Sequence, residues 1–178
     1  MLSGETAAGL YPLEALRTMA RIAQRAEADI NYVKRFKERE SEHTPDVTNA
    51  ISHATVTSAH DLGAAAILTV TKSGRTARMI SKFRPNCPII CCAMDARVCR
   101  RLALSWGVIP LIIEEAHNTD DLFERAVEAG EKAGLLHNGE LVVMTAGVPL
   151  GISGTTNLMK VHVVGHILVT GRGVSRRS

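Results

Sequence analysis

Apolar residues recur along this chain in two alternating patterns, short continuous runs and longer runs with helical spacing. The short runs, rich in β-branched residues, predict buried strands near residues 65–70, 88–92, 108–113 and 140–145. Apolar positions three or four residues apart predict helices near residues 13–30, 44–62, 75–83, 95–105 and 119–134. Such alternation is typical of an α/β fold with a mostly parallel sheet. We therefore expect a three-layer α/β/α architecture, preceded by an N-terminal helical arm.

Cap and turn residues refine the boundaries of these elements. Thr44-Pro45-Asp46 is predicted to open the second helix, with the proline in its first turn. Thr119 and Gly134 are predicted to cap the two ends of the helix near 119–134. A fifth strand is expected from Leu158 to Val164. Because the connection before it is too short for a helical crossover, this strand should run antiparallel at the edge of the sheet.

The segment between the first two helices, residues 31–44, is rich in charged side chains. It contains Lys34, Arg35 and Lys37, and acidic residues follow at once from Glu38 onwards. Mixed charges of this kind are typical of a solvated connector. We therefore place a domain boundary near residue 40.

Composition narrows the classes of function. The chain has 178 residues, of which 46% are hydrophobic and 22% charged, as in ordinary soluble domains. No apolar run approaches the roughly 18 residues that span a bilayer, and the N-terminus lacks the features of a signal peptide. We therefore expect a cytoplasmic protein with no membrane partner. The net charge of +3 is mild and scattered, which argues against a nucleic-acid partner.

Neither the cysteines nor the histidines predict a metal site. The spacing of His53 and His60 on one helix is about 10.5 Å, and that of His162 and His166 on one strand is about 13 Å, too far to share an ion. The four cysteines have no CxxC spacing and are expected to be buried, reduced thiols. They are Cys87, Cys91, Cys92 and Cys99. No nucleophile–base pair for covalent catalysis can be assigned either.

The turn after the strand near 65–70 carries the strongest candidate chemistry. A strand, a glycine-bearing turn and a helix start follow one another, so free backbone N–H groups meet the positive end of a helix dipole. Two cations and three hydroxyls stand in six residues, which suits a phosphate group. The candidate residues are Thr71, Lys72, Ser73, Gly74, Arg75 and Thr76. The alternative is that the hydroxyls only cap the helix. The turn matches neither common nucleotide-binding motif.

A second loop, after the strand near 140–145, has similar chemistry. It offers glycines for close approach and hydroxyls, at Gly151, Ser153, Gly154 and Thr155. It is no GxSxG elbow, because the second glycine comes one residue early. Both loops follow strand carboxyl ends, the edge where α/β sheets bind ligands. We expect the two loops to be able to clamp a sugar phosphate between them.

Several segments, in order along the chain, resemble pyruvate kinases. Residues 1–12, MLSGETAAGLYP, closely resemble the MLSGETAxGxYP segment of that family. The segments TKSGRT (71–76), SKFRP (81–85), GISGTTN (151–157) and MKVHV (159–163) resemble its C-terminal domain. The resemblance covers essentially the whole chain.

The resemblance also implies what this chain lacks. Pyruvate kinases transfer a phosphoryl group from phosphoenolpyruvate to ADP on a barrel domain, with Mg²⁺ and usually K⁺ as cofactors. Residues 1–40 would be the last barrel loop and helix with a linker, 41–170 the C-terminal α/β domain, and 171–178 a truncated linker. Ser3, Glu5 and Thr6 match positions that border the family's active site. We expect the fragment itself to be inactive and to need no cofactor.

The resemblance further implies a regulatory role. The family's C-terminal domain binds sugar-phosphate or nucleotide effectors at the loop matching Thr71 to Thr76, and it pairs with other subunits. We expect a homo-oligomer that uses the strand from Leu158 to Val164. Bisphosphate-responsive members use a further arginine, and Leu122 stands near that position here. A monophosphate effector is therefore expected, although Arg125 lies close enough to leave the question open.

Two other hypotheses remain at the level of sequence. The chain could be a free-standing phosphometabolite sensor or scaffold with no kinase role. It could also be a purely structural assembly domain whose phosphate loop stays empty. A gene that encodes no barrel upstream would favour the free-standing sensor over the kinase fragment. Binding of a phosphate compound would argue against the purely structural domain.

Overall fold

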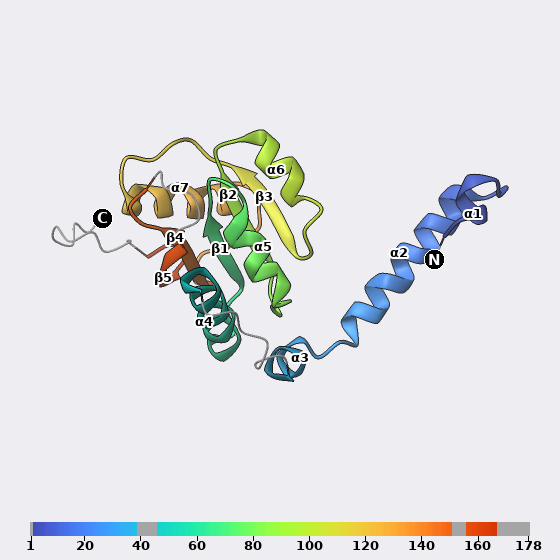
Figure 1. Cartoon of the computed structure of the whole chain (residues 1–178), viewed down its shortest axis with the longest axis horizontal. Coiled ribbons are helices and arrows are strands. Elements are labelled where there is room, and N and C mark those ends of the chain that lie inside the picture. The colour runs from blue at the N-terminus through green and yellow to red at the C-terminus, as the bar shows by residue number, and fades with distance from the viewer. Residues whose placement is uncertain (1, 39–45, 151–155, 167–178) are drawn as a thin grey trace. The chain divides into compact units, whose positions relative to one another are not determined.

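The computed structural model describes residues 2–38, 46–150 and 156–166 (Figure 1). The chain forms two compact units, Met1–Tyr32 and Val33–Ser178. The first unit is helical, and the second contains a five-stranded sheet with its covering helices. The predicted α/β class is confirmed.

The first unit consists of a short helix, α1 (Gly4–Ala7), and a long one, α2 (Pro12–Ala28). Pro12 stands in the first turn of α2, where a missing N–H costs nothing. The predicted helix is confirmed, although it ends before Ile30; α1 was not predicted. Neither helix has a buried residue, and Leu16 and Ile22 are 56% and 57% exposed. Within its own unit, α2 therefore leaves an apolar stripe uncovered.

The sheet of the second unit has the order β3-β2-β1-β4-β5. Its strands are β1 (Ala66–Val70), β2 (Ile89–Ala93), β3 (Val108–Ile112), β4 (Leu141–Gly147) and β5 (Thr156–Val163). The first four are parallel, and β5 pairs antiparallel with β4 at the edge. The predicted edge strand is thus confirmed. The carboxyl ends of β1 and β4, from which both candidate loops emerge, lie side by side, since Thr69 is the register partner of Thr145.

Helices cover both faces of the sheet, which confirms the three-layer prediction (Figure 1). One face packs against α7 (Thr119–Lys132), whose Phe123 is buried with Leu68 and Met144. The other packs against α4 (Val47–Leu62), α5 (Arg75–Lys82) and α6 (Ala96–Leu102). Alternate residues of each strand face the two cores, which is the period of two that a pleated strand requires.

The cysteines are free thiols, as predicted, and Cys91 and Cys92 face opposite cores. Burial raises the pKa of the Cys87 thiol to about 11 and that of Cys92 to about 12. These thiols therefore stay protonated at neutral pH, and they behave as small apolar side chains.

Three predicted helix ends were wrong in detail: the start of α4 and both caps of α7. Asp46 is the N-cap of α4, its carboxylate accepting from the Asn49 amide at 3.3 Å, so the helix begins at Val47 and Pro45 precedes it. Asn118, rather than Thr119, caps α7, because its Oδ1 accepts from the Asp121 amide at 2.8 Å. Ala133 is the C-cap of α7, and Gly134 follows it with a positive φ of 68°. None of the helices in the described ranges is long and apolar enough to cross a membrane.

The predicted solvated connector was wrong for its first half, which forms the helix α3 (Tyr32–Glu38). Phe36 of α3 is only 6% exposed and joins the core beneath α4 and α5. Its ring stacks on His53 with centroids 4.8 Å apart and meets Phe83 edge-on at 5.8 Å. Burial of the Phe36 side chain therefore holds this otherwise charged helix against the core. The connector's second half, 39–44, lies outside the described residues.

Candidate functional site

The predicted phosphate loop joins β1 to α5 at the carboxyl end of the central strand. Thr71 follows β1 directly, and α5 begins at Arg75. Between them, Gly74 has a φ of 79°, a left-handed conformation that L side chains rarely adopt. A Cβ at Gly74 would also lie 3.0 Å from both Arg78 Nη1 and Leu102 Cδ2. The turn therefore favours glycine on two independent grounds, its backbone conformation and the close approach of its neighbours.

The hydroxyl of Thr71 shapes the loop from inside. Its Oγ1 accepts a hydrogen bond from the Gly74 amide at 3.0 Å, and the residue is only 8% exposed. One amide of the loop is thus already bonded within the protein. Thr71 therefore serves the loop's conformation, whereas Ser73 is half-buried and Lys72 is exposed.

The start of α5 has no side-chain cap. Gly74 is the N-cap residue, no side chain hydrogen-bonds at the cap position, and the first turn holds no acidic residue. The first helical backbone bond runs from the Arg78 amide to the Gly74 carbonyl at 3.1 Å. The amides of Arg75, Thr76 and Ala77 therefore lie at the positive end of the helix dipole without the capping hydroxyl that the alternative hypothesis required.

Two charged residues at the loop escaped prediction from the sequence. Asp46, the N-cap of α4, forms an ion pair with Arg75, Nη2 to Oδ2, at 3.6 Å. Arg78, one helical turn after Arg75, places Nη1 3.5 Å from the Ser73 carbonyl oxygen. The i, i+3 spacing of the two arginines was a visible signal for Arg78. Nothing local indicated Asp46, which precedes Arg75 by more than two dozen residues.

The second candidate loop lies largely outside the described residues, which include none of Gly151, Ser153, Gly154 and Thr155. Its flank is described. The hydroxyl of Thr156, the first residue of β5, lies 2.5 Å from the hydroxyl of Thr76 in α5. Both residues are buried, at 2% and 5% exposure. The first residue of β5 therefore lies directly against the helix that the first loop opens.

Asn157 holds the two ends of the second loop together. Its Oδ1 accepts from the Val148 amide at 2.9 Å, and its Nδ2 donates to the Val148 carbonyl at 2.6 Å. The carboxamide thus continues the antiparallel pairing of β4 and β5 beyond Gly147, where the register shifts. Asn157 belongs to one of the family-like segments of the sequence, but no role was predicted for it.

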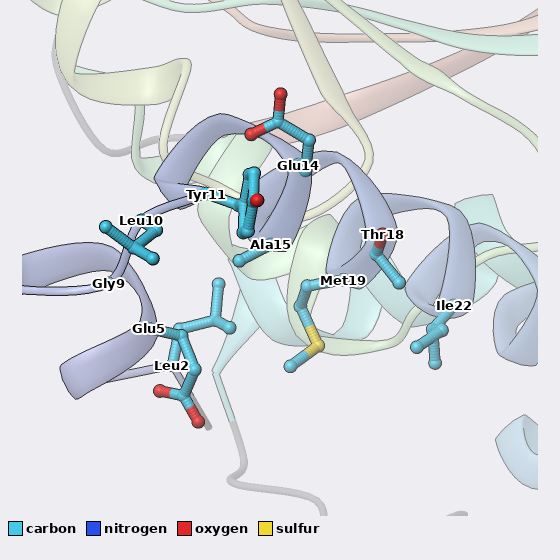
Figure 2. Close-up of a pocket in the computed structure, with 10 residues that line it drawn as sticks. All are labelled: Leu2, Glu5, Gly9, Leu10, Tyr11, Glu14, Ala15, Thr18, Met19 and Ile22. Carbon is cyan, nitrogen blue, oxygen red and sulfur yellow. The ribbon is translucent and has the colours of Figure 1, made fainter.

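The residues expected to border a barrel active site all lie in the first unit, at α1. Ser3 is the N-cap residue, its amide donates to Glu5 Oε2 at 3.0 Å, and the Thr6 hydroxyl donates to the Ser3 carbonyl at 3.1 Å. The Ser3 amide is the main cause that lowers the pKa of the exposed Glu5. Glu5 also lines an open, mainly apolar hollow between α1 and α2, beside Tyr11 and Met19 (Figure 2).

The two residues near the expected bisphosphate position are both engaged elsewhere. Leu122 is buried in the core beneath α7, at 3% exposure. Arg125 donates to Asp121 Oδ1 at 2.7 Å and to Glu114 Oε2 at 3.2 Å. The hydrogen bond to Asp121 is the main cause that raises the pKa of Arg125, and the same bond lowers the pKa of Asp121. Two carboxylates therefore already hold the guanidinium.

Metal ligands do not gather at any of these places. Across residues 2–38, 46–150 and 156–166, no group of three or more His, Cys, Asp or Glu side chains could hold a metal ion.

The sequence of this chain matches a known protein family and several of its members. The sequence profile of the family described as "Pyruvate kinase, alpha/beta domain" matches residues 49–162. A pyruvate kinase of Clostridium acetobutylicum is 49% identical over 164 residues, which is 92% of this chain and 35% of that protein. A pyruvate kinase of Geobacillus stearothermophilus is 46% identical over 178 residues, all of this chain and 30% of that protein.

A solved structure shows the same fold. The crystal structure of a pyruvate kinase from Cryptosporidium parvum superposes with a TM-score of 0.80 at 34% sequence identity. The superposition covers 92% of this chain and 32% of that one. The chain thus spans about a third of the length of the relatives that it matches.

Proposed function

Since this chain belongs to the pyruvate kinase family, we propose that it is the effector-binding C-terminal part of such an enzyme. In this proposal the loop from Thr71 to Thr76 binds the phosphate of a small metabolite, and the loop after β4 closes over it. The observation that carries the proposal is the start of α5, where three successive amides lack a side-chain cap beside Arg75.

Electrostatics support an anionic ligand at this place. A helix N-terminus carries about half a positive charge, and phosphate oxygens accept both amide and guanidinium hydrogen bonds. Lys72, Arg75 and Arg78 stand in or beside the loop, and the carboxylate of Asp46 contacts Arg75. A phosphate at α5 would compete with Asp46 for the Arg75 guanidinium.

The ligand class we propose is a sugar monophosphate or a nucleoside monophosphate. A second phosphate would need another cation near the start of α7. Leu122 is apolar and buried there, and Arg125 already has two carboxylate partners. A second phosphate could bind Arg125 only by breaking these ion pairs, and their loss would offset much of the binding free energy gained. This supports a ligand with one phosphate.

The activity of the whole enzyme would be transfer of a phosphoryl group from phosphoenolpyruvate to ADP in glycolysis, in the cytoplasm. Because the chain spans about a third of its relatives, the barrel, Mg²⁺ and K⁺ belong to the remaining part in this proposal. The exposed apolar stripe of α2 supports this, because helices of isolated domains normally bury such a stripe. A coupled assay should detect no pyruvate release by this chain, and turnover would contradict the division of roles.

We assign oligomerisation to β5. It is the last strand in the sheet order, and its outer edge has no strand partner among the described residues. An edge strand without a strand partner invites pairing with another chain, and the side chain of Val161 in β5 is 44% exposed. The Thr76–Thr156 hydroxyl contact joins α5 to the start of this strand. Ligand binding at α5 would thereby influence subunit pairing, provided that the paired and unpaired states differ in ligand affinity.

Isothermal titration of this chain with ribose 5-phosphate, AMP and fructose 1,6-bisphosphate tests the proposal. We expect binding of a monophosphate, and a loss of affinity of about tenfold or more when Ser73→Ala and Arg75→Ala are combined. Arg97→Ala is the matched control, since Arg97 also stands in the first turn of a helix that follows a strand and pairs with an aspartate, Asp95. Binding that the double variant leaves unchanged would contradict the site.

A further inference from the structure

The contact between α3 and α4 contains a histidine, His60, whose protonation state is set by a backbone donor. The amide of Asn86, in the loop after α5, donates a hydrogen bond to His60 Nε2 at 3.0 Å. A nitrogen that accepts this bond carries no proton, so His60 must be the neutral tautomer with its proton on Nδ1. Nδ1 is itself buried, with no hydrogen-bond partner among the described residues.

The same histidine forms one wall of the place where Phe36 is buried. Phe36 meets His60 edge-on with ring centroids 5.2 Å apart, and it also stacks on His53. Phe83, at the end of α5, completes the cluster. Phe36 is the one buried residue of α3, so this cluster is what attaches α3.

We propose that this cluster is an acid-sensitive latch: protonation of His60 breaks its bond to the Asn86 amide and releases α3 from α4 and the end of α5. A proton on Nε2 would place two donors face to face and leave a charge in a partly apolar site. Both effects oppose the packed arrangement. α3 begins at Tyr32, the last residue of the first unit, and continues into the second, so the latch acts where the chain passes from one unit to the other.

The surrounding charges partly cancel one another. Asp61, the next residue of α4, favours the protonated imidazole, and Lys37 of α3 disfavours it. His53 is the other titratable group of the cluster, while Phe83 and Asn86 carry no charge. Burial is the largest influence, and it lowers the pKa of His60 below its ordinary value near 6.5. An unfolded or detached His60 therefore takes up a proton first, so α3 loses attachment as pH falls below about 6.5.

Hydrogen exchange of the 178-residue chain at pH 7.5 and pH 5.5, corrected for intrinsic exchange rates, tests the latch. We expect peptides covering residues 32–38 to lose protection by about fivefold at the lower pH, while the sheet changes little. His60→Gln keeps an acceptor for Asn86 but cannot titrate, and it should abolish the difference. His53→Gln should retain it. Equal protection of wild-type α3 at both pH values, or a difference that persists in His60→Gln, would overturn the proposal.

A measurement on the wild-type chain covers the case in which His60→Gln does not fold. Long-range ¹H–¹⁵N spectra of the imidazole ring distinguish the two neutral tautomers and follow protonation directly. We expect His60 to hold its proton on Nδ1 at pH 7.5 and to titrate below 6.5, in step with the loss of α3 protection. A proton on Nε2 at pH 7.5 would overturn the assignment from which the latch follows.

Discussion

Within the loop between β1 and α5, individual residues have separable roles. Gly74 supplies a backbone conformation, the Thr71 hydroxyl bonds the Gly74 amide, and the Thr76 hydroxyl reaches across to Thr156. Arg75 supplies charge and is held by Asp46. Because these roles rest on different atoms, single substitutions should change stability and ligand affinity independently.

Gly74→Ala should destabilise the chain by about 2–3 kcal/mol, because it combines a positive φ with a close approach to Leu102. Urea denaturation followed by circular dichroism measures this. Gly63→Ala is the matched control, since Gly63 also has a positive φ but a Cβ added there would meet nothing within 4 Å. We expect a loss of only about 1 kcal/mol there. Equal losses in the two variants would show that the close approach does not matter.

Asp46→Asn should tighten phosphate binding about threefold, because it frees Arg75 and removes a negative charge from the site. Asparagine remains a good N-cap, so α4 should be retained. Titration with ribose 5-phosphate measures the change. Asp95→Asn alters an equivalent N-cap and ion pair on α6, and it should leave affinity unchanged. Weaker binding by Asp46→Asn would mean that Asp46 supports the ligand rather than competing with it.

Two buried threonines should respond to valine substitution with opposite signs. Thr145 is fully buried, and its hydroxyl has no hydrogen-bond partner among the described residues. Thr145→Val should therefore stabilise the chain by about 1 kcal/mol in urea denaturation. Thr76→Val should cost about 1–2 kcal/mol, because it leaves the buried Thr156 hydroxyl without its partner. A loss of stability in Thr145→Val would indicate a partner for that hydroxyl.

At the scale of elements, α2 differs from every helix that packs on the sheet. None of its residues is buried, whereas α4, α5, α6 and α7 each bury several. Tertiary packing supplies most of the stability of helices in proteins. On its own, α2 should therefore be only marginally stable.

Hydrogen exchange at neutral pH should show this difference directly. We expect amides of α2 to exchange at least about a hundredfold faster than those of β1 and β4, whose residues are almost all buried. Protection of α2 that grows with protein concentration would show that its stripe docks on another copy. Uniform protection of both regions in a dilute monomer would contradict the view that the stripe lacks its natural partner.

The sequence predicted those elements whose signal is local. Apolar runs located all five strands, and the short connection before β5 indicated its antiparallel direction. The errors involved partners distant in sequence: Phe36 meets His53 and Phe83, and Asp46 meets Arg75. Contacts between residues so far apart leave no periodic pattern in a single sequence, so they could not be predicted from it. The predicted N-cap of α7 was wrong because Asn118 and Thr119 are neighbouring residues that are both good N-caps. The sequence alone does not decide between them.

At the scale of the whole molecule, we propose a regulatory α/β unit joined to a helical segment that belongs with a larger partner. The family match covers the sheet and the helices that flank it. The relatives are about three times as long as this chain. The Thr76–Thr156 contact links the proposed ligand site to the sheet edge, and Phe36 attaches α3 to the core of the second unit. Regulation in this proposal therefore depends on whether α5 receives an anion at its N-terminus.

Amide NMR of the ¹⁵N-labelled chain during titration with ribose 5-phosphate tests that claim most directly. We predict saturable shifts that are largest at the amides of Arg75, Thr76 and Ala77, with smaller ones at Thr156. Inorganic phosphate should move the same amides at higher concentration. A saturable response centred on another surface, such as Arg97 to Arg101, or no response at the start of α5, would contradict the proposed site.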